Sequence, residues 1–361
     1  MNVEPTAYIN VAYDAFFSNN FIERTGGTAV VRNWKRIFMF SSADDIKFHQ
    51  WNLWEKQRSP QVFETFFNTL ITKQLKARRL YSSKKIQLFL FLMPPGLLSN
   101  SLPQLIYVHD VPLARENQRI KDRIYNYLVT YSAKKSIQVL TPTLTQKKRL
   151  INNGINENSI NVLPYPIDSV YWQKSQTVKP KKTNVLVVLS SLLWRKHPEA
   201  IFRVYDRLPL PTRNLLTFTI AGNINDLSSS LPADCKKHLS KFILVNLPSN
   251  EELAVLYQNA LCTVMLSKFE GYGLPVAESM ASGTPVIVSN DPSLKEVAGE
   301  GGWSCDADDY DKAALLITKM VEDGASYQKL SEKALLASQK YRDLSLFNSL
   351  KMMIKKSIHA C

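Results

Sequence analysis

The chain has 361 residues, of which 45% are hydrophobic and 21% charged, a composition typical of globular proteins. It is too long for one ordinary core, and no apolar run approaches the roughly 18 residues of a membrane-spanning helix. No basic segment followed by an apolar one marks a secretory signal, and the four cysteines match no metal or redox spacing. We therefore expect a cytoplasmic protein of two domains with reduced cysteines.

The formal net charge is +14, and roughly ten of these excess charges precede Trp172. A basic protein can bind nucleic acid, an anionic membrane or anionic substrates. The sequence contains no zinc-ligand pair, no aromatic RNA-binding motif and no basic helix without an apolar face. The charge therefore favours an anionic membrane surface over nucleic acid as a partner.

The first half of the chain alternates predicted strands and helices. The predicted strands are 8–12, 86–93, 105–108, 137–140 and 161–163, and the predicted helices are 29–40, 60–81, 119–135 and 141–153. Gly26 and Gly27 precede the first helix, where glycine permits either the close approach of an anion or a plain turn. Both readings remain open from the residues alone.

The helix predicted at 60–81 has apolar residues at helical spacing from Phe63 to Ile71, and basic residues from Lys73 to Arg79 crowd its end. It fits a core helix whose cations interact with the C-terminal dipole. It also fits an interfacial helix, because basic residues beside an aromatic face suit the lipid headgroup boundary.

His109 and Asp110 directly follow the predicted strand 105–108. Open α/β sheets bind their ligands at the carboxyl ends of parallel strands, so His109 is a candidate site residue. The alternative is that His109 caps a loop and forms a hydrogen bond with Asp110.

A polar segment at 171–182 is the candidate linker, and beyond it a second alternating series begins. Strands are predicted at 185–189, 216–220, 242–245, 260–266 and 285–289, and helices at 198–207 and 310–322. Ser249 and Glu252 have the spacing of a capping box at the start of a further helix. Arg195 and Lys196 lie near a helix start, where cations oppose the dipole unless an anion is present.

The segment 260–290 predicts a strand, a glycine loop, a short helix and a second strand. Gly271 and Gly273 form the loop, and the helix N-terminus that follows suits a phosphate. Glu270 and Glu278 frame this position, and carboxylates accept hydrogen bonds from hydroxyl groups. The combination indicates a phosphate-bearing polyhydroxyl ligand such as a nucleotide sugar, although a plain turn and a dipole-stabilised Glu278 explain the same residues.

Glu270 and Glu278, separated by seven residues, resemble the signature of the family-4 glycosyltransferases. The resemblance continues through GTPVIVSN and SLKEVAGEGG in the second half, and through YVHD (107–110) and PYPID (164–168) in the first. It implies an α/β GT-B fold of two doubly wound Rossmann-like domains facing across a cleft. The expected domains are an acceptor domain, 1–171, and a donor domain, 172–344, with a helix at 345–361 packing back on the first.

The resemblance also implies roles for residues of the second half. Arg195 and Lys196 would neutralise the donor diphosphate, Glu270 would hold the hydroxyl groups of the donor sugar, and Glu278 would hold the ribose. His197 departs from the asparagine that the family usually has there. The remaining expected donor contacts are the loop N–H groups of Gly271, Tyr272, Gly273 and Leu274, and the base-reading loop around Val245 and Leu247.

In the first half, the resemblance places His109 beside the transferred sugar and the loop of Gly26 and Gly27 across the cleft. The Asp306-Ala307-Asp308 segment has a pattern that glycosyltransferases of another fold use for manganese. We interpret it as acidic residues at the start of the helix 310–322, where the dipole stabilises them, and expect no metal.

The implied activity is metal-independent transfer, with anomeric retention, of a sugar from a GDP- or UDP-sugar to a hydroxyl group of a glycan or lipid-linked acceptor. No cofactor is expected. The Arg-Lys pair resembles enzymes that often use mannose donors. Two alternatives remain, a nucleotide-sugar 2-epimerase of the same fold and a non-enzymatic basic nucleic-acid-binding protein.

Overall fold

The computed structural model describes residues 8–14, 26–40, 45–51, 62–83, 86–110, 120–173 and 182–359. The chain forms two compact units, the first made of Met1–Glu23, Gly27–Pro166 and Asp343–Cys361, and the second of Arg24–Gly26 and Ile167–Arg342. The chain passes between them at 166/167 and 342/343, a few residues before the boundaries expected from the sequence.

The first unit is built on a parallel sheet of six described strands in the order β2-β1-β3-β4-β5-β6. The strands are β1 (Ile9–Asp14), β2 (Ile46–Trp51), β3 (Leu88–Phe91), β4 (Gln104–Tyr107), β5 (Gln138–Thr141) and β6 (Ile160–Val162). Every residue of β3, β4 and β5 is buried. This is expected of a parallel sheet that helices cover on both faces.

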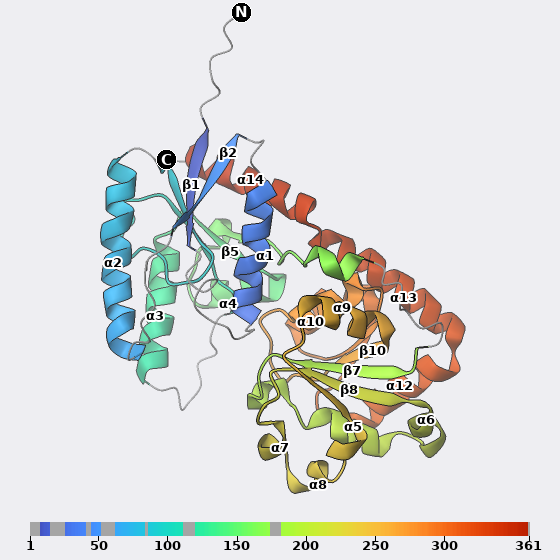
Figure 1. The fold of residues 1–361 in the computed structure, drawn as a ribbon. Helices are drawn as coiled ribbons and strands as arrows, with labels where there is room; N and C mark the ends of the chain where they lie inside the picture. Colours follow the sequence, from blue (N-terminus) through green and yellow to red (C-terminus); the bar gives the residue numbers. More distant parts are fainter. Residues whose placement is uncertain are drawn as a thin grey trace, which may run out of the picture. The chain divides into compact units, whose positions relative to one another are not determined.

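Five described helices belong to this unit (Figure 1): α1 (Gly26–Phe40), α2 (Val62–Ser82), α3 (Ile120–Lys134), α4 (Leu144–Asn152) and α14 (Asp343–His359). Ala77 of α2 and Val129 of α3 enter the same core cluster. The C-terminal helix α14 is fixed to this unit by an ion pair of 2.8 Å between Arg36 and Asp343, and Phe347 on α14 packs against Phe48.

The second unit has a parallel sheet of six described strands in the order β12-β11-β10-β7-β8-β9. They are β7 (Asn184–Leu189), β8 (Thr217–Gly222), β9 (Ile243–Asn246), β10 (Ala260–Met265), β11 (Val286–Ser289) and β12 (Gly302–Cys305). Numbered within the unit, this is the 3-2-1-4-5-6 order of the dinucleotide-binding fold. The strand order therefore reverses between β7 and β10.

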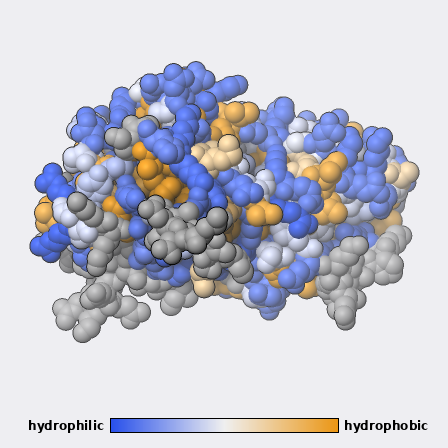
Figure 2. Space-filling model, turned by 90° about the horizontal axis from the view of Figure 1, so that it is seen from above, coloured by the Kyte–Doolittle hydropathy of each residue, from blue (hydrophilic) through white to orange (hydrophobic). Residues whose placement is uncertain are grey.

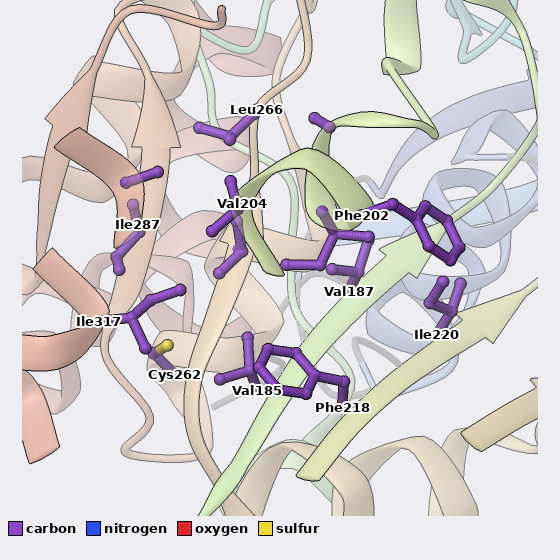
Figure 3. Packing of buried hydrophobic residues seen from close by; sticks show 14 of the residues in the cluster. Val185, Val187, Phe202, Val204, Phe218, Ile220, Cys262, Leu266, Ile287 and Ile317 are labelled. Atoms are coloured by element: carbon purple, nitrogen blue, oxygen red, sulfur yellow. The ribbon is translucent and has the colours of Figure 1, made fainter. Parts of the chain in front are cut away.

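The helices of this unit are α5 (Ala200–Arg207), α6 (Leu210–Leu215), α7 (Leu227–Ser230), α8 (Ala233–Lys236), α9 (Asn250–Asn259), α10 (Leu274–Ala281), α11 (Pro292–Ala298), α12 (Tyr310–Glu322) and α13 (Gly324–Ser338). Figure 3 shows Val187 of β7 close to Phe202 of α5, and Ile220 of β8 near the same ring. The predicted capping box of Ser249 and Glu252 is confirmed at the start of α9. This packed core supports the loops at the carboxyl ends of the strands.

The two doubly wound α/β domains expected from the sequence are confirmed. One local difference lies before α5, where the helix predicted from residue 198 begins at Ala200, after a 3-10 turn at Trp194–Lys196.

None of the helices that the structure describes combines the length and the apolar character needed to cross a bilayer. The face drawn in Figure 2 is largely hydrophilic, with hydrophobic side chains in separate patches.

Candidate functional site

The loops after β7 and β10 meet at the carboxyl edge of the second sheet, where the strand order reverses. The backbone N–H of Lys268 donates to the carbonyl oxygen of Arg195 at 2.8 Å, which joins the two loops directly. Open α/β sheets bind ligands in the crevice at such a reversal, because the loops on either side diverge there. The topology therefore places the residues of these two loops at the expected binding position.

Arg195, Lys196 and Glu270 form an ion-pair cluster at this position, which we call the cation cluster. Lys196 Nζ lies 2.7 Å from Glu270 Oε1 and 2.8 Å from Oε2, whereas Arg195 Nη1 lies 3.5 Å from Oε2. The side chain of Glu270 is 5% exposed and that of Arg195 27%. Two cations share one carboxylate, so the cluster retains one positive charge, which suits an anionic ligand.

His197 fixes the turn that carries the two cations. It has a left-handed backbone, with φ of 52°, and its ring is buried. Nδ1 lies 3.1 Å from the carbonyl oxygen of Leu266, and Nε2 lies 3.2 Å from the hydroxyl group of Tyr310. A carbonyl only accepts, so Nδ1 carries a proton and donates it to Leu266. The ring thereby holds the turn against the end of β10.

Gly273 shapes the glycine loop where α10 begins. It has φ of 102°, and a Cβ built there would lie 2.5 Å from Leu294 Cδ2. Within the described chain, no side chain caps α10, and Pro275 in its first turn has no N–H to offer. The partial positive charge of this helix end, with the N–H of Leu274, therefore remains to favour an anion.

Glu278, expected to hold a ribose, is 9% exposed and accepts a hydrogen bond of 3.0 Å from the hydroxyl group of Tyr257. Burial and the nearby Glu278 carboxylate raise the pKa of Tyr257 well above its ordinary value. The phenol therefore stays protonated and donates. The structure thus gives Glu278 a partner inside the unit that the sequence did not indicate.

Three further residues expected to contact the donor, Tyr272, Val245 and Leu247, differ from one another in how far they are buried. The ring of Tyr272 is buried against Tyr341, with centroids 6.1 Å apart, so its expected contribution is limited to its backbone. Val245 is half-buried at the end of β9, and Leu247 is 40% exposed. The N–H of Leu247 donates to the carbonyl of Gly222 at 2.8 Å, which ties this loop to the end of β8.

Asp291 is a residue that the sequence reading missed. Its Oδ1 caps α11 by accepting from the N–H groups of Ser293 and Leu294, at 2.9 and 3.1 Å, and its Oδ2 accepts from the N–H of Glu270 at 3.3 Å. The aspartate followed by Pro292 is a recognisable helix-start signal. The contact with Glu270 could not be read from sequence because it joins two different loops.

In the first unit, both ring nitrogens of His109 have partners other than Asp110, the partner proposed in the alternative interpretation. Nε2 lies 2.5 Å from the carbonyl oxygen of Leu92, and Nδ1 lies 2.6 Å from the hydroxyl group of Tyr165. The carbonyl only accepts, so Nε2 carries the proton and Tyr165 donates to Nδ1. Burial lowers the pKa of His109 to about 4, although the Leu92 contact opposes this shift. His109 is therefore neutral at pH 7.

A buried ion pair lies near the strand-order reversal of the first sheet, between β1 and β3. Lys73 Nζ lies 2.8 Å from Asp14 Oδ2 and donates to the carbonyl oxygen of Pro95 at 3.0 Å. It fixes the turn after β3 to the end of β1. Gly26 and Gly27 open α1, while residues 15–25 before them lie outside the described chain.

Residues 172–336 match the family model described as "Glycosyl transferases group 1". This segment of the chain is similar to the group 1 glycosyltransferases. This matched segment includes the cation cluster, the glycine loop and both glutamates, so the resemblance expected from the sequence is confirmed.

Two curated relatives are mannosyltransferases. The chain is 29% identical to O-antigen chain mannosyltransferase B of Escherichia coli over 150 residues, 40% of this chain and 39% of that protein. It is 27% identical to O-antigen chain mannosyltransferase RfbU of Salmonella typhimurium over 209 residues, 57% of each. The alignments thus span between two fifths and three fifths of these relatives.

The fold is also that of a solved structure, Anabaena Alr3699/HepE in complex with UDP and glucose. The TM-score is 0.72, with 12% identity, and the match covers 96% of this chain and 100% of that one. Together with the two parallel sheets, this likeness shows the GT-B fold.

Proposed function

We propose that the protein transfers a sugar from a nucleotide-sugar donor to a hydroxyl group of an acceptor. The observation that carries this proposal is the meeting of Arg195, Lys196 and Glu270 at the strand-order reversal, beside the uncapped start of α10. A surplus cation, a helix N-terminus and a carboxylate are the groups that a diphosphate joined to a sugar requires. The group 1 match over the same segment supports the assignment.

In the proposed reaction, the diphosphate of the donor binds Arg195 and Lys196. Its oxygens replace Glu270 as the partner of Lys196, so the carboxylate becomes available to the hydroxyl groups of the sugar. The cations then stabilise the negative charge that develops on the leaving diphosphate, a function for which no metal ion is required. Transfer proceeds with retention, and the departing phosphate accepts the proton of the attacking hydroxyl group.

His109 takes no part in proton transfer in this scheme. Both of its nitrogens are occupied by Leu92 and Tyr165, and its ring is neutral at pH 7. Its role is to contact the donor sugar as a fixed neutral group.

The donor we propose is a mannose nucleotide, and the acceptor is a glycan or a lipid-linked saccharide. The support for mannose is that two of the curated relatives are named as O-antigen chain mannosyltransferases. The base is guanine or uracil, and the UDP complex of the Anabaena protein supports a nucleoside diphosphate as the leaving group.

A thermal-shift panel of GDP- and UDP-sugars tests the donor site. A ligand at a hundred times its dissociation constant adds about 2.7 kcal/mol of stability, so a true donor raises the melting temperature measurably. Lys196→Ala should abolish the shift, whereas Lys333→Ala, which removes an exposed pair with Glu300, should retain it. A panel without any shift, or full transfer by the Lys196 variant, would refute the proposal.

Product analysis with the donor alone separates the rival activities. A 2-epimerase converts the nucleotide sugar without an acceptor, whereas the proposed transferase forms its product only when an acceptor hydroxyl is supplied. Accumulation of an epimeric nucleotide sugar would replace the transferase assignment.

We also place the protein on the cytoplasmic face of an anionic membrane, where lipid-linked acceptors are available. Support comes from α2, where Ile71 and Leu75 are 57% and 55% exposed and lie four residues apart on one helix face. Arg78 and Arg79 are exposed on the following turn. An apolar pair beside cations suits the headgroup boundary.

Co-sedimentation with vesicles checks this location. We expect binding to anionic vesicles and much less to neutral ones, and weaker binding by Ile71→Ser/Leu75→Ser. Leu315→Ser on α12 is a matched control, because Leu315 is 58% exposed in the other unit. Equal sedimentation with both vesicle types would exclude the proposed surface.

A further inference from the structure

Asp306 and Asp308 follow β12, the edge strand of the second sheet, and precede α12. The sequence suggests that they serve the start of this helix. However, it is Asp309 that caps α12, by accepting a hydrogen bond of 2.9 Å from the N–H of Lys312. The other two carboxylates are directed to different partners.

Asp306 contacts the loop between β11 and α11. Its Oδ1 accepts a hydrogen bond of 2.6 Å from the side-chain amide of Asn290. The next residue, Asp291, accepts from the backbone N–H of Glu270 at 3.3 Å. Asp306 therefore binds the side chain next to Asp291, and Asp291 accepts the hydrogen bond from Glu270.

Asp308 contacts the other side of the site. Its Oδ1 lies 3.2 Å from Lys268 Nζ and 3.5 Å from His197 Nε2, and it accepts a hydrogen bond of 3.1 Å from the hydroxyl group of Tyr310. Lys268 donates its backbone N–H to the carbonyl oxygen of Arg195. Asp308 therefore stabilises both loops that form the cation cluster.

We infer that Asp306 and Asp308 are positioning residues for the donor site, an inference that rests on the proposed function. From one short segment, they fix the loops after β7, β10 and β11 on either side of Glu270. Asp308 neutralises Lys268 and leaves the charge of Arg195 and Lys196 to the ligand. The two aspartates thus act on the loops that carry the proposed diphosphate ligands, and they do not contact the diphosphate themselves.

Amide hydrogen exchange tests the positioning without any ligand. Asp308→Ala should speed exchange at the N–H of Lys268, and Asp306→Ala should speed it at the N–H of Glu270. Asp311→Ala is the matched control, because the side chain of Asp311 is 80% exposed and its ion pair within the described chain is with Arg207, at 3.4 Å. Unchanged exchange at both amides would overturn the inference, whether or not a nucleotide binds.

Binding of GDP and UDP, measured by calorimetry, tests the consequence for the donor site. Asp308→Ala should weaken binding of the preferred nucleotide roughly three- to tenfold, an effect in the lower part of the range for coupled residues of one polar network, while Asp311→Ala should not. Adding Asp308→Ala to Lys268→Ala should cause less loss than Asp308→Ala causes in the wild type, because the contact between Lys268 and Asp308 is already absent.

The outcomes separate the two claims. If the wild-type protein binds neither nucleotide, the proposed function fails while the exchange measurement still decides the positioning. If the wild type binds and Asp308→Ala binds equally well, the inference fails and the proposed function stands. A loss that is fully additive with Lys268→Ala, with only a lower melting temperature, would reduce Asp308 to a structural role.

Discussion

Lys196 Nζ contacts both carboxylate oxygens of Glu270, at 2.7 and 2.8 Å. The two residues are 74 positions apart, and they meet because β7 and β10 are neighbours in the sheet. The carboxylate is almost fully buried, so its charge requires a partner when no ligand is bound. A diphosphate would bind the same ammonium group, so the Glu270 carboxylate and the diphosphate compete for Lys196.

Glu270→Gln should separate nucleotide binding from sugar transfer. The amide leaves Arg195 and Lys196 without their anionic partner, so we expect GDP or UDP to bind at least as tightly as in the wild type. Transfer should fall by roughly a hundredfold or more, the scale of losing one electrostatic contact in an active site. Calorimetry and a transfer assay measure the two effects, and a parallel loss of both would contradict the shared-partner interpretation.

Tyr165→Phe should change the state of His109, whereas Tyr107→Phe should not. The hydroxyl group of Tyr165 donates to His109 Nδ1, but that of Tyr107, whose ring stacks on His109 at 5.0 Å, donates to the carbonyl of Leu163. Each variant leaves one buried acceptor unpaired, which costs about 1–3 kcal/mol of stability.

The matched pair is distinguished by the ¹⁵N resonances of the His109 ring. The Nδ1 resonance should shift on loss of the Tyr165 hydrogen bond and stay in place in Tyr107→Phe. Transfer should decrease about tenfold more in the Tyr165 variant if a fixed neutral ring is required. Identical spectra in the two variants would show that the tautomer depends on Leu92 alone.

The strand, glycine loop, helix and strand of 260–289 could be predicted from sequence because local signals define each part. Proline stands near the start of α10, and Gly283, with φ of 73°, ends it. The partners of the site residues could not be predicted in this way. Glu270 with Lys196 and Asp308 with Lys268 join loops that become neighbours only through the strand order.

The partners of the aspartates in the Asp306-Ala307-Asp308 segment likewise could not be predicted from the sequence. The sequence suggested dipole stabilisation at the start of α12, and one aspartate, Asp309, does cap the helix. The partners of Asp306 and Asp308 lie 16 and 40 positions earlier, on Asn290 and Lys268. Periodicity carries no information about such contacts, since they depend on how the loops fold over the sheet edge.

Gly273→Ala should destabilise the protein more than Gly283→Ala. Both glycines have a left-handed backbone, which costs an alanine about 1–2 kcal/mol. Only at Gly273 does the added Cβ meet a neighbour, Leu294 Cδ2 at 2.5 Å, which adds about 1–3 kcal/mol of overpacking. Urea unfolding of the two variants measures the difference, and equal losses would mean that Leu294 moves aside at no cost.

Stability should fall between pH 7.5 and pH 5 in a way that depends on His109. Burial lowers its pKa in the folded protein to about 4, below the ordinary histidine value of 6.5. Above pH 6.5 the ring is neutral in both the folded and unfolded states. As the pH falls from about 6.5 towards 4, the unfolded chain takes up the proton first, so folding becomes less favourable.

The expected loss over this interval is about 2 kcal/mol, because each pH unit between the two pKa values contributes about 1.4 kcal/mol. Urea unfolding at both pH values, with His109→Gln as the control, isolates this loss, since glutamine has no proton to take up. Equal pH dependence in the two proteins would mean that burial does not lower the pKa of His109. A ring that remains unprotonated down to pH 5 has no proton on Nδ1 to give to a leaving group, which leaves that proton to the phosphate of the donor.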